Sequence, residues 1–289
     1  MVGIRDDILQ VHQATFDEIR RKLGENRQYF WEPPEFDRTK TIQELTRLHV
    51  PVQQATVSST KYGKYLDAAM QTGIYDGYAN HFGSHFQRKA LEHFTSFELM
   101  QISRDDAYMD VASSGSVVPE ILQALYELRE PWRQDLAYPP GVHGHKVGSN
   151  ATNIPLPDGT LTKMALHCSF EHFEADADSG FIQEGARLLC RGGLICIVPL
   201  YMSNVYHILS SLELIEKLGM PDFEPDTPIL WSARPNNHHG RMYDPVALKR
   251  RVINVAFDAG LHPAVVDVSF EPRCLGIGTN LALMLRKVS

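Results

Sequence analysis

Small and polar residues follow a short apolar run in the segment DVASSGS, from Asp110 to Ser116. A turn of small residues between a strand and a helix lets backbone N–H groups and the helix N-terminus approach a ligand, and Ser114 and Ser116 add hydroxyl groups. The dinucleotide-binding pattern G-x-G-x-x-G is absent, which disfavours an NAD enzyme. The turn alone leaves two interpretations open: a ligand-binding loop, or a tight connection that requires small residues.

An acidic residue follows this turn at the distance where a ribose is usually bound. Asp135 comes about 20 residues after Gly115, near the end of a second predicted strand at 132–136. A carboxylate can accept two hydrogen bonds from a ribose diol, whereas the alternative is an ordinary loop acid in solvent. The coincidence of Asp135 with the turn favours a bound nucleoside.

The chain from Asp106 to Leu200 resembles the class I S-adenosylmethionine-dependent methyltransferases, in particular those of methyltransferase type 11. The segment SNATNIPLPDGT is similar to the family string G-D-A-x-x-L-P-F-x-D-G, and Glu171 and His172 form the E-H pair after the next strand. EGARLLCRGG is similar to E-x-x-R-V-L-x-P-G-G, which precedes the fifth strand. Four motifs in this order and spacing indicate the fold of this superfamily.

The resemblance implies a role for each matching position, with S-adenosylmethionine as the cofactor. The first turn would hold its methionine part, Asp135 its ribose hydroxyls, and Asn150, where the family usually has Asp, its adenine. His167 and Cys168 would border the sulfonium and the acceptor. The cofactor-binding residues implied in this way are Asp110, Ala112, Ser113, Ser114, Gly115, Asp135, Leu136, Asn150, Ala151, His167 and Cys168.

The first motif departs from the family pattern D-x-G-x-G-x-G, because Ala112, Ser114 and Ser116 occupy the glycine positions. Alanine is tolerated there only if the backbone does not need a positive φ, and serine must not crowd the cofactor. Either hydroxyl groups replace backbone contacts in this chain, or cofactor binding has been lost. We favour the first, because the acids, Gly115 and the E-H pair are retained.

Histidines supply the candidate bases for the reaction. Methyl transfer is an in-line displacement, so an enzyme has to align the acceptor and exclude water, and a hydroxyl acceptor also needs a base. We expect His172 or His239 in this catalytic role, although a structural role for His172 is the alternative. Residues 203–250 are expected to form a substrate lid, in which His238, Arg241 and Tyr243 would bind the acceptor.

A metal site is the other use that thirteen histidines suggest. His81 and His85 are four residues apart and His93 lies further along the same predicted helical region, but neither H-E-x-x-H nor a cysteine pair supports them. We therefore expect no metal, with these histidines at the edge of the active-site cleft.

Two regions of different pattern make up the chain. Residues 1–105 read as helices that form an N-terminal cap, and residues 106–289 alternate short apolar strands with helices, which predicts a parallel sheet. PAVVDVSF and NLALMLRKV are joined by too few residues for a crossover helix, so they should pair antiparallel. The predicted fold is therefore α/β, a Rossmann-like seven-stranded sheet with an antiparallel last strand and a helical cap.

The composition and charge of the chain limit the kinds of partner that it is expected to bind. The 289 residues carry a formal charge of −7, which disfavours nucleic acid and anionic membranes. No apolar run approaches the ~18 residues of a membrane helix, and the first residues carry acids where a secretory signal would be apolar. The cysteines form no C-x-x-C pair and indicate a reducing cytoplasm; they are Cys168, Cys190, Cys196 and Cys274.

Three functions follow from these observations. The first is an S-adenosylmethionine-dependent methyltransferase acting at oxygen on a small molecule, a glycan or a peptide. The second is a catalytically inactive methyltransferase-like module that binds a partner protein. The third, a nucleotide-sugar or dinucleotide enzyme on a similar sheet, is disfavoured by the absent glycine motif and by the antiparallel last strand.

Overall fold

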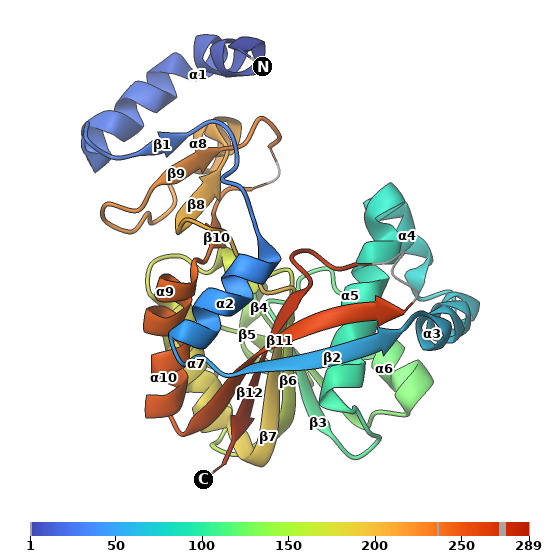
Figure 1. The fold of residues 1–289 in the computed structure, drawn as a ribbon. Helices are drawn as coiled ribbons and strands as arrows, with labels where there is room; N and C mark the ends of the chain where they lie inside the picture. Colours follow the sequence, from blue (N-terminus) through green and yellow to red (C-terminus); the bar gives the residue numbers. More distant parts are fainter. Residues whose placement is uncertain (1, 236, 272–275, 289) are drawn as a thin grey trace.

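A computed structural model describes residues 2–235, 237–271 and 276–288, without the side chains of residues 2–5. Its centre is an eight-stranded sheet of order β2-β11-β12-β7-β6-β3-β4-β5 (Figure 1). β12 is antiparallel to both of its neighbours, and the other neighbouring strands are parallel. The strands are β2 (Val52–Ser58), β3 (Ala107–Val111), β4 (Glu130–His143), β5 (Lys146–Gly148), β6 (Leu161–His167), β7 (Leu189–Val198), β11 (Leu261–Glu271) and β12 (Leu281–Lys287).

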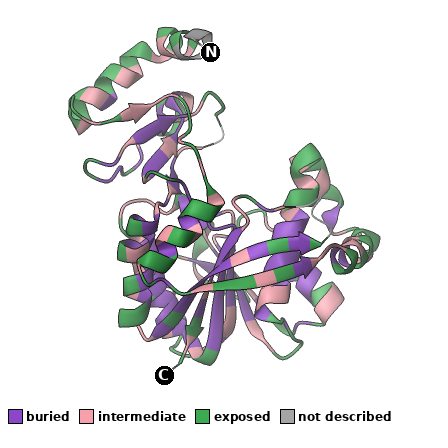
Figure 2. Cartoon of the chain, viewed as in Figure 1, coloured by how far each residue is buried: buried purple, intermediate pink, exposed green. Residues whose placement is uncertain are grey.

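Helices cover both faces of this sheet (Figure 1). The sheet separates the core into two apolar clusters, one on each face. The central strands are buried on both sides, as Figure 2 shows, because helices shield each face from water. One face carries α2 (Arg38–Arg47), α7 (Ala177–Leu188), α9 (Pro245–Leu248) and α10 (Asn254–Asp258). The other carries α3 (Ser59–Gln71), α4 (Tyr75–Phe82), α5 (Phe86–Met100) and α6 (Val118–Tyr126).

A small second sheet stands apart from the main one, at the upper end of the view in Figure 1. Its order is β1-β9-β8-β10, and it packs with α1 (Val2–Leu23) and α8 (Leu212–Leu218) around a separate apolar cluster. Phe16, Tyr29 and Trp231 form the aromatic centre of that cluster. The strands are β1 (Tyr29–Phe30), β8 (His207–Ser210), β9 (Ile229–Trp231) and β10 (Gly240–Met242).

The predicted fold class is confirmed, including the antiparallel pairing of the last two strands. Two features differ from the expectation. The region expected to be helical also contains β2, which extends the main sheet beyond β11. Residues 203–242 form three strands and a helix of the second sheet, and β1 joins them from the N-terminal region.

No helix in the described ranges has both the length and the apolar character needed to cross a membrane. Cys168, Cys190 and Cys196 are free thiols, and Cys274 lies outside the described residues.

Candidate active site

The carboxyl ends of the adjacent strands β3 and β6 carry residues with unusual backbone geometry. Ala112 follows β3 and Cys168 follows β6, and both have a φ of 51°. A non-glycine residue in this left-handed region costs about 1–2 kcal/mol, and such strain concentrates at functional sites. From the sequence, alanine is tolerated at position 112 only where the backbone does not need a positive φ. The structure does not meet this condition, because Ala112 adopts a positive φ. Gly115, with a φ of 75°, fits the turn without that cost.

Two backbone N–H groups donate hydrogen bonds to the Asp135 carboxylate, one from the first turn and one from Ala137. Ser114 N donates to Oδ2 at 2.8 Å, and Ala137 N donates to Oδ1 at 2.8 Å. Gln134, which is buried, accepts from Ala112 N and donates through its amide to Ser149 O. Since each carboxylate oxygen has more than one lone pair, Asp135 can still accept hydrogen bonds from a diol.

A cavity of about 910 Å³ opens beside Asp135 and contains the residues that the resemblance assigns to adenine. Leu136 is 76% exposed, so its apolar side chain is available to a flat ring. The Oδ1 atom of Asn150 accepts from Thr152 N and from Thr152 Oγ1, both at 3.0 Å. The Asn150 carbonyl oxygen is thus engaged within the chain, and its amide NH₂ is the group that can donate to a ring nitrogen.

A larger cleft of about 1080 Å³ adjoins this cavity. The two share Ala112, Cys168, Ser169 and His172, so they meet where β3 and β6 end. The first turn, from Asp110 to Val117, forms one wall of the cleft, and α4 and α5 contribute another. The structure thus brings together at one place all eleven residues that the sequence assigned to the cofactor.

A chain of buried polar groups extends inward from the wall of the larger cleft, which is lined by Asp110, His167 and His93. His167 Nδ1 lies 3.2 Å from Asp110 Oδ1, and its Nε2 lies 2.8 Å from Ser96 Oγ. The ring of His93 packs edge-on against His167, at 4.9 Å between centroids, and contacts the Tyr75 hydroxyl through Nδ1 at 2.9 Å. Burial lowers the pKa of His93 well below its ordinary value, so this imidazole stays neutral.

Cys168 belongs to a polar cluster with two residues of α5. Lys89 Nζ donates to Cys168 Sγ at 2.6 Å, and the thiol donates to Glu92 Oε2 at 3.0 Å. Lys89 also pairs with Glu92, at 3.2 Å. Burial and the Glu92 carboxylate raise the pKa of Cys168, so the side chain is a thiol and not a nucleophilic thiolate.

His172 lies where the two cavities meet, and Glu171 beside it lines the larger cleft. His172 Nδ1 lies 2.5 Å from the carbonyl oxygen of His239, and because a carbonyl only accepts, Nδ1 carries the proton. The lone pair of a neutral His172 is then on Nε2, which lies 3.7 Å from Glu171 Oε1. Burial raises the pKa of Glu171.

The His239 ring, predicted as a base, is buried, and burial together with Arg241 lowers its pKa to about 3. Within the described residues it lines neither cavity, so His239 acts here through its carbonyl group. His238 also lies outside both cavities, and its Nε2 donates to Gly219 O at 2.7 Å. The predicted catalytic role of His239 and the acceptor-binding role of His238 are therefore corrected.

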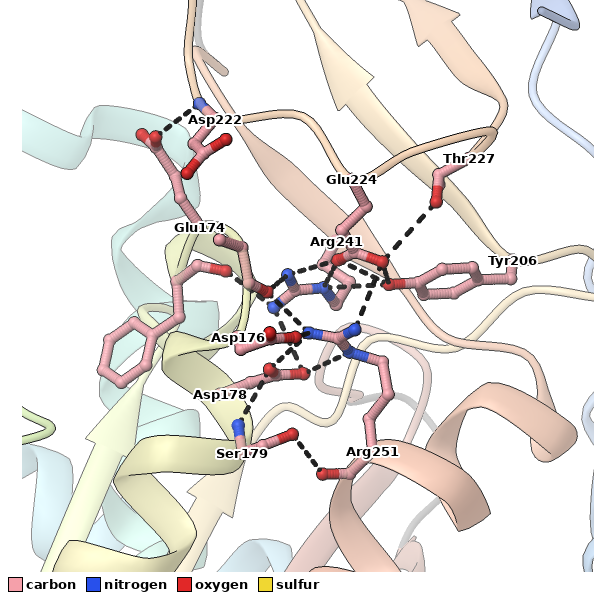
Figure 3. Close-up of polar contacts among 12 residues, drawn as sticks. Glu174, Asp176, Asp178, Ser179, Tyr206, Asp222, Glu224, Thr227, Arg241 and Arg251 are labelled. Atoms are coloured by element: carbon pink, nitrogen blue, oxygen red, sulfur yellow. Dashed lines mark hydrogen bonds and ion pairs between the residues drawn. The ribbon is translucent and has the colours of Figure 1, made fainter.

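Arg241 and Tyr243, predicted to bind the acceptor, belong instead to a buried ionic network. Figure 3 shows Arg241 in this network together with Glu224, Asp178 and Arg251. Arg241 pairs with Glu224 at 2.5 Å and with Asp178 at 3.2 Å, and Tyr243 donates to Asp178 at 2.7 Å. Arg251 also pairs with Asp178, at 2.7 Å. The network joins the segment before α7 to the second sheet, so these side chains stabilise the junction and cannot reach an acceptor.

Three residues of the site were not identified from the sequence: Lys89 and Tyr201, which line the cleft, and Glu92, which accepts a hydrogen bond from Cys168. The sequence contained a signal for two of them, because Lys89 and Glu92 are three residues apart on a predicted helix, which is the spacing of an ion pair on one helix face. The described residues include no group of three or more side chains suited to a metal ion. His81 and His85 line the cleft. His81 lies in α4, which ends before Gly83, and His85 lies in the short 3₁₀ turn that precedes α5.

No family model and no curated protein matches this sequence. Solved structures do resemble the chain at low identity. One is the 1,6-didemethyltoxoflavin-N1-methyltransferase of Burkholderia thailandensis, with 13% identity over 83% of this chain and 94% of that chain, at a TM-score of 0.45. Another is geranyl diphosphate C-methyltransferase from Streptomyces coelicolor, with 11% identity over 71% and 78% and a TM-score of 0.43.

A third is a methyltransferase in complex with the Haloferax volcanii Trm112 methyltransferase activator, with 13% identity over 75% of this chain and 97% of that chain, at a TM-score of 0.45. The strand order of the main sheet and its antiparallel β12 agree with the Rossmann-like α/β fold expected from the sequence.

Proposed function

We propose that this protein is an S-adenosylmethionine-dependent methyltransferase that methylates an oxygen atom of a small molecule, a glycan or a peptide. The observation that carries the proposal is the pair of adjoining cavities at the carboxyl ends of β3, β4 and β6. Ligands of open α/β sheets bind at these ends. The separation of the chain into a cap of residues 1–105 and a core of residues 106–289 is part of the proposal, with both regions lining the larger cleft.

The residues present fit such a cofactor. Asp135 offers free lone pairs to a ribose diol, Asn150 offers an amide donor to the adenine, and Leu136 offers an exposed apolar surface. Asp110 Oδ2, which is buried and has no hydrogen-bond partner among the described residues, lies in the wall of the cleft. An unpartnered buried carboxylate oxygen is well suited to a cationic ligand. When bound, S-adenosylmethionine supplies an electrophilic methyl group.

His172 is the base of the proposed reaction. Its side chain is 45% exposed and lines both cavities, and the His239 carbonyl fixes the tautomer that leaves Nε2 free. A proton taken from an acceptor hydroxyl would go to Nε2, and the nearby Glu171 carboxylate would stabilise the imidazolium. His167 and Ser96 hold Asp110 in place, while α4 and α5 shield the cleft from water. The sparse cysteines support a reducing, cytoplasmic location.

Calorimetric titration with S-adenosylhomocysteine tests the proposal. We expect binding by the unmodified chain and a loss of ~10- to 100-fold in Asp135→Ala, because two charge-assisted hydrogen bonds disappear. Asp135→Asn keeps an acceptor for the turn and should fall between these affinities. Asp105→Ala is the control, since Asp105 is exposed and pairs only with the surface Arg129 in the described structure.

No binding at millimolar cofactor would reject the proposal and favour the second function, an inactive module that binds a partner protein. Binding without any effect of Asp135→Ala would retain a ligand site but reject the assigned orientation of the nucleoside.

A further inference from the structure

Cationic side chains from two distant parts of the chain line the larger cleft. Arg88 and Lys89 come from α5, and Arg234 comes from the segment between β9 and β10. Arg88 and Arg234 are exposed, so their guanidinium groups can reach a ligand in the cleft. His81 and His85 line the same cleft.

The acids of the site lie deeper than these cations. Asp110, Glu92 and Glu171 are each at most 9% exposed. Glu92 alone faces both α5 cations, at 3.2 Å from Lys89 and 3.8 Å from Arg88, so one carboxylate is shared between two positive charges. Asp110 lies on the cofactor side of the cleft, next to the first turn. The part of the cleft lined by these cations is therefore positive in a chain whose formal charge is −7.

Aromatic rings lie beside the cations. Tyr78 and Phe82 pack with their centroids 4.5 Å apart, and Lys89 Nζ lies 5.8 Å from the centroid of Phe82. Both rings line the cleft, as does Tyr201. This surface suits a planar apolar ligand, and the neighbouring guanidinium groups suit a planar oxyanion.

We propose that the methyl acceptor is an aromatic compound that carries a carboxylate or a phosphate, and that Arg88 and Arg234 bind this oxyanion while Tyr78 and Phe82 contact the ring. The inference rests on the proposed function, since it assumes that the cofactor occupies the side of the first turn. It assigns the opposite side of the same cleft to acceptor recognition.

The test uses the full chain saturated with S-adenosylhomocysteine and probes that share a benzene ring and carry an anionic, a neutral or a cationic substituent. The probes are 4-hydroxybenzoate, its neutral analogue 4-hydroxybenzamide, the cationic 4-hydroxybenzylamine, and phenyl phosphate. We expect the two anions to bind at least about tenfold more tightly than the neutral and cationic probes, and less tightly at high salt. The preferred anion, carboxylate or phosphate, identifies the oxyanion.

Arg88→Gln and Arg234→Gln should each weaken anion binding by about five- to tenfold. Arg129→Gln, a surface change outside the cleft, should leave it unchanged. Anion binding no tighter than that of the amide, no detectable anion binding at millimolar concentration, or full affinity in both cleft variants would overturn the inference. Because S-adenosylhomocysteine binding is measured first on the same samples, failure of the cofactor site is distinguished from failure of the acceptor site.

Discussion

Two polar clusters lie close to the ends of β6 and α7, and they differ in how completely their charges are paired. In the network around Asp178, both carboxylate oxygens accept hydrogen bonds from Arg251, as Figure 3 shows. Tyr243 donates a further hydrogen bond to Oδ2. In the cleft, Asp110 Oδ2 and Glu92 Oε1 are buried without a hydrogen-bond partner in the described structure. Stable cores satisfy buried polar groups, so the first cluster serves folding and the second retains capacity for a ligand.

Backbone strain occurs in both clusters. The cleft contains Ala112 and Cys168 with a φ of 51°, and Ala175, whose carbonyl oxygen accepts hydrogen bonds from Arg241 and Arg251, has a φ of 44°. Strained residues persist where the surrounding fold holds them in place, and two parallel strands end directly before Ala112 and Cys168. Only in the cleft does the strain coincide with buried carboxylate oxygens that have no hydrogen-bond partner in the described structure, and this distinguishes the cleft from the network around Asp178.

The largest expected effect is in the paired network. Asp178→Asn should lower the free energy of unfolding by about 3–5 kcal/mol, because it leaves Arg241 and Arg251 buried with less negative charge. Asp176→Asn is the matched control, since Asp176 contacts the same Arg251 at 3.3 Å but is 91% exposed. It should cost less than about 1 kcal/mol. Denaturant titration of both variants measures the difference, and equal losses would contradict the assignment of this network to stability.

The second prediction concerns pH and His239, whose pKa is lowered to about 3 from 6.5. As the pH falls below 6.5, the unfolded chain binds a proton at this histidine and the folded chain does not, so the folded state loses stability. The loss is roughly 1.4 kcal/mol per pH unit well below pH 6.5 and above the folded pKa. His239→Gln should remove this slope while leaving that of the other buried histidines. Unfolding titrations of both proteins from neutral pH to about pH 4 test it; parallel curves would refute it.

The central strands were predictable because they are continuous apolar runs, and the antiparallel pair was predictable because its connection is short. Strand β2 was missed because VQQATVS is an edge strand whose polar residues face solvent. The second sheet was missed for a different reason. Its strands are two to four residues long, and β1 pairs with β9 about 200 residues later in the chain. Local patterns do not contain such pairings.

The candidate site was likewise predictable where local spacing along the chain reveals it, and not where it depends on contacts between residues distant in sequence. The first turn and Asp135 were found because their spacing along the chain is characteristic. Lys89 and Cys168 are 79 positions apart and meet only through the packing of α5 on the sheet. Arg241 was misassigned because its sequence neighbours suggest an exposed polar loop, whereas its partners Glu224 and Asp178 lie far away in sequence.

The strain at Ala112 gives the third prediction. Ala112→Gly should raise the free energy of unfolding by about 1 kcal/mol, because glycine adopts a positive φ without the steric cost of a Cβ atom. Affinity for S-adenosylhomocysteine should be retained. Ala186→Gly, in the interior of α7, is the control of opposite sign and should destabilise by about 1 kcal/mol. Thermal or denaturant unfolding distinguishes them, and a destabilised Ala112→Gly would show that the turn is not strained.

The smallest expected effect on stability is in the cleft, where Asp110→Asn repeats the substitution proposed at Asp178. Both carboxylates are buried, but Asp110 Oδ2 has no hydrogen-bond partner in the described structure, and Oδ1 lies 3.2 Å from His167 Nδ1 and accepts from the Tyr108 hydroxyl at 3.5 Å. Neutralising a poorly paired buried charge removes a desolvation cost as well as an attraction, so the net change should stay below about 1 kcal/mol. Affinity for S-adenosylhomocysteine should nevertheless fall. If Asp110→Asn lost as much stability as Asp178→Asn, unpaired charge would no longer distinguish the binding site from the stabilising network.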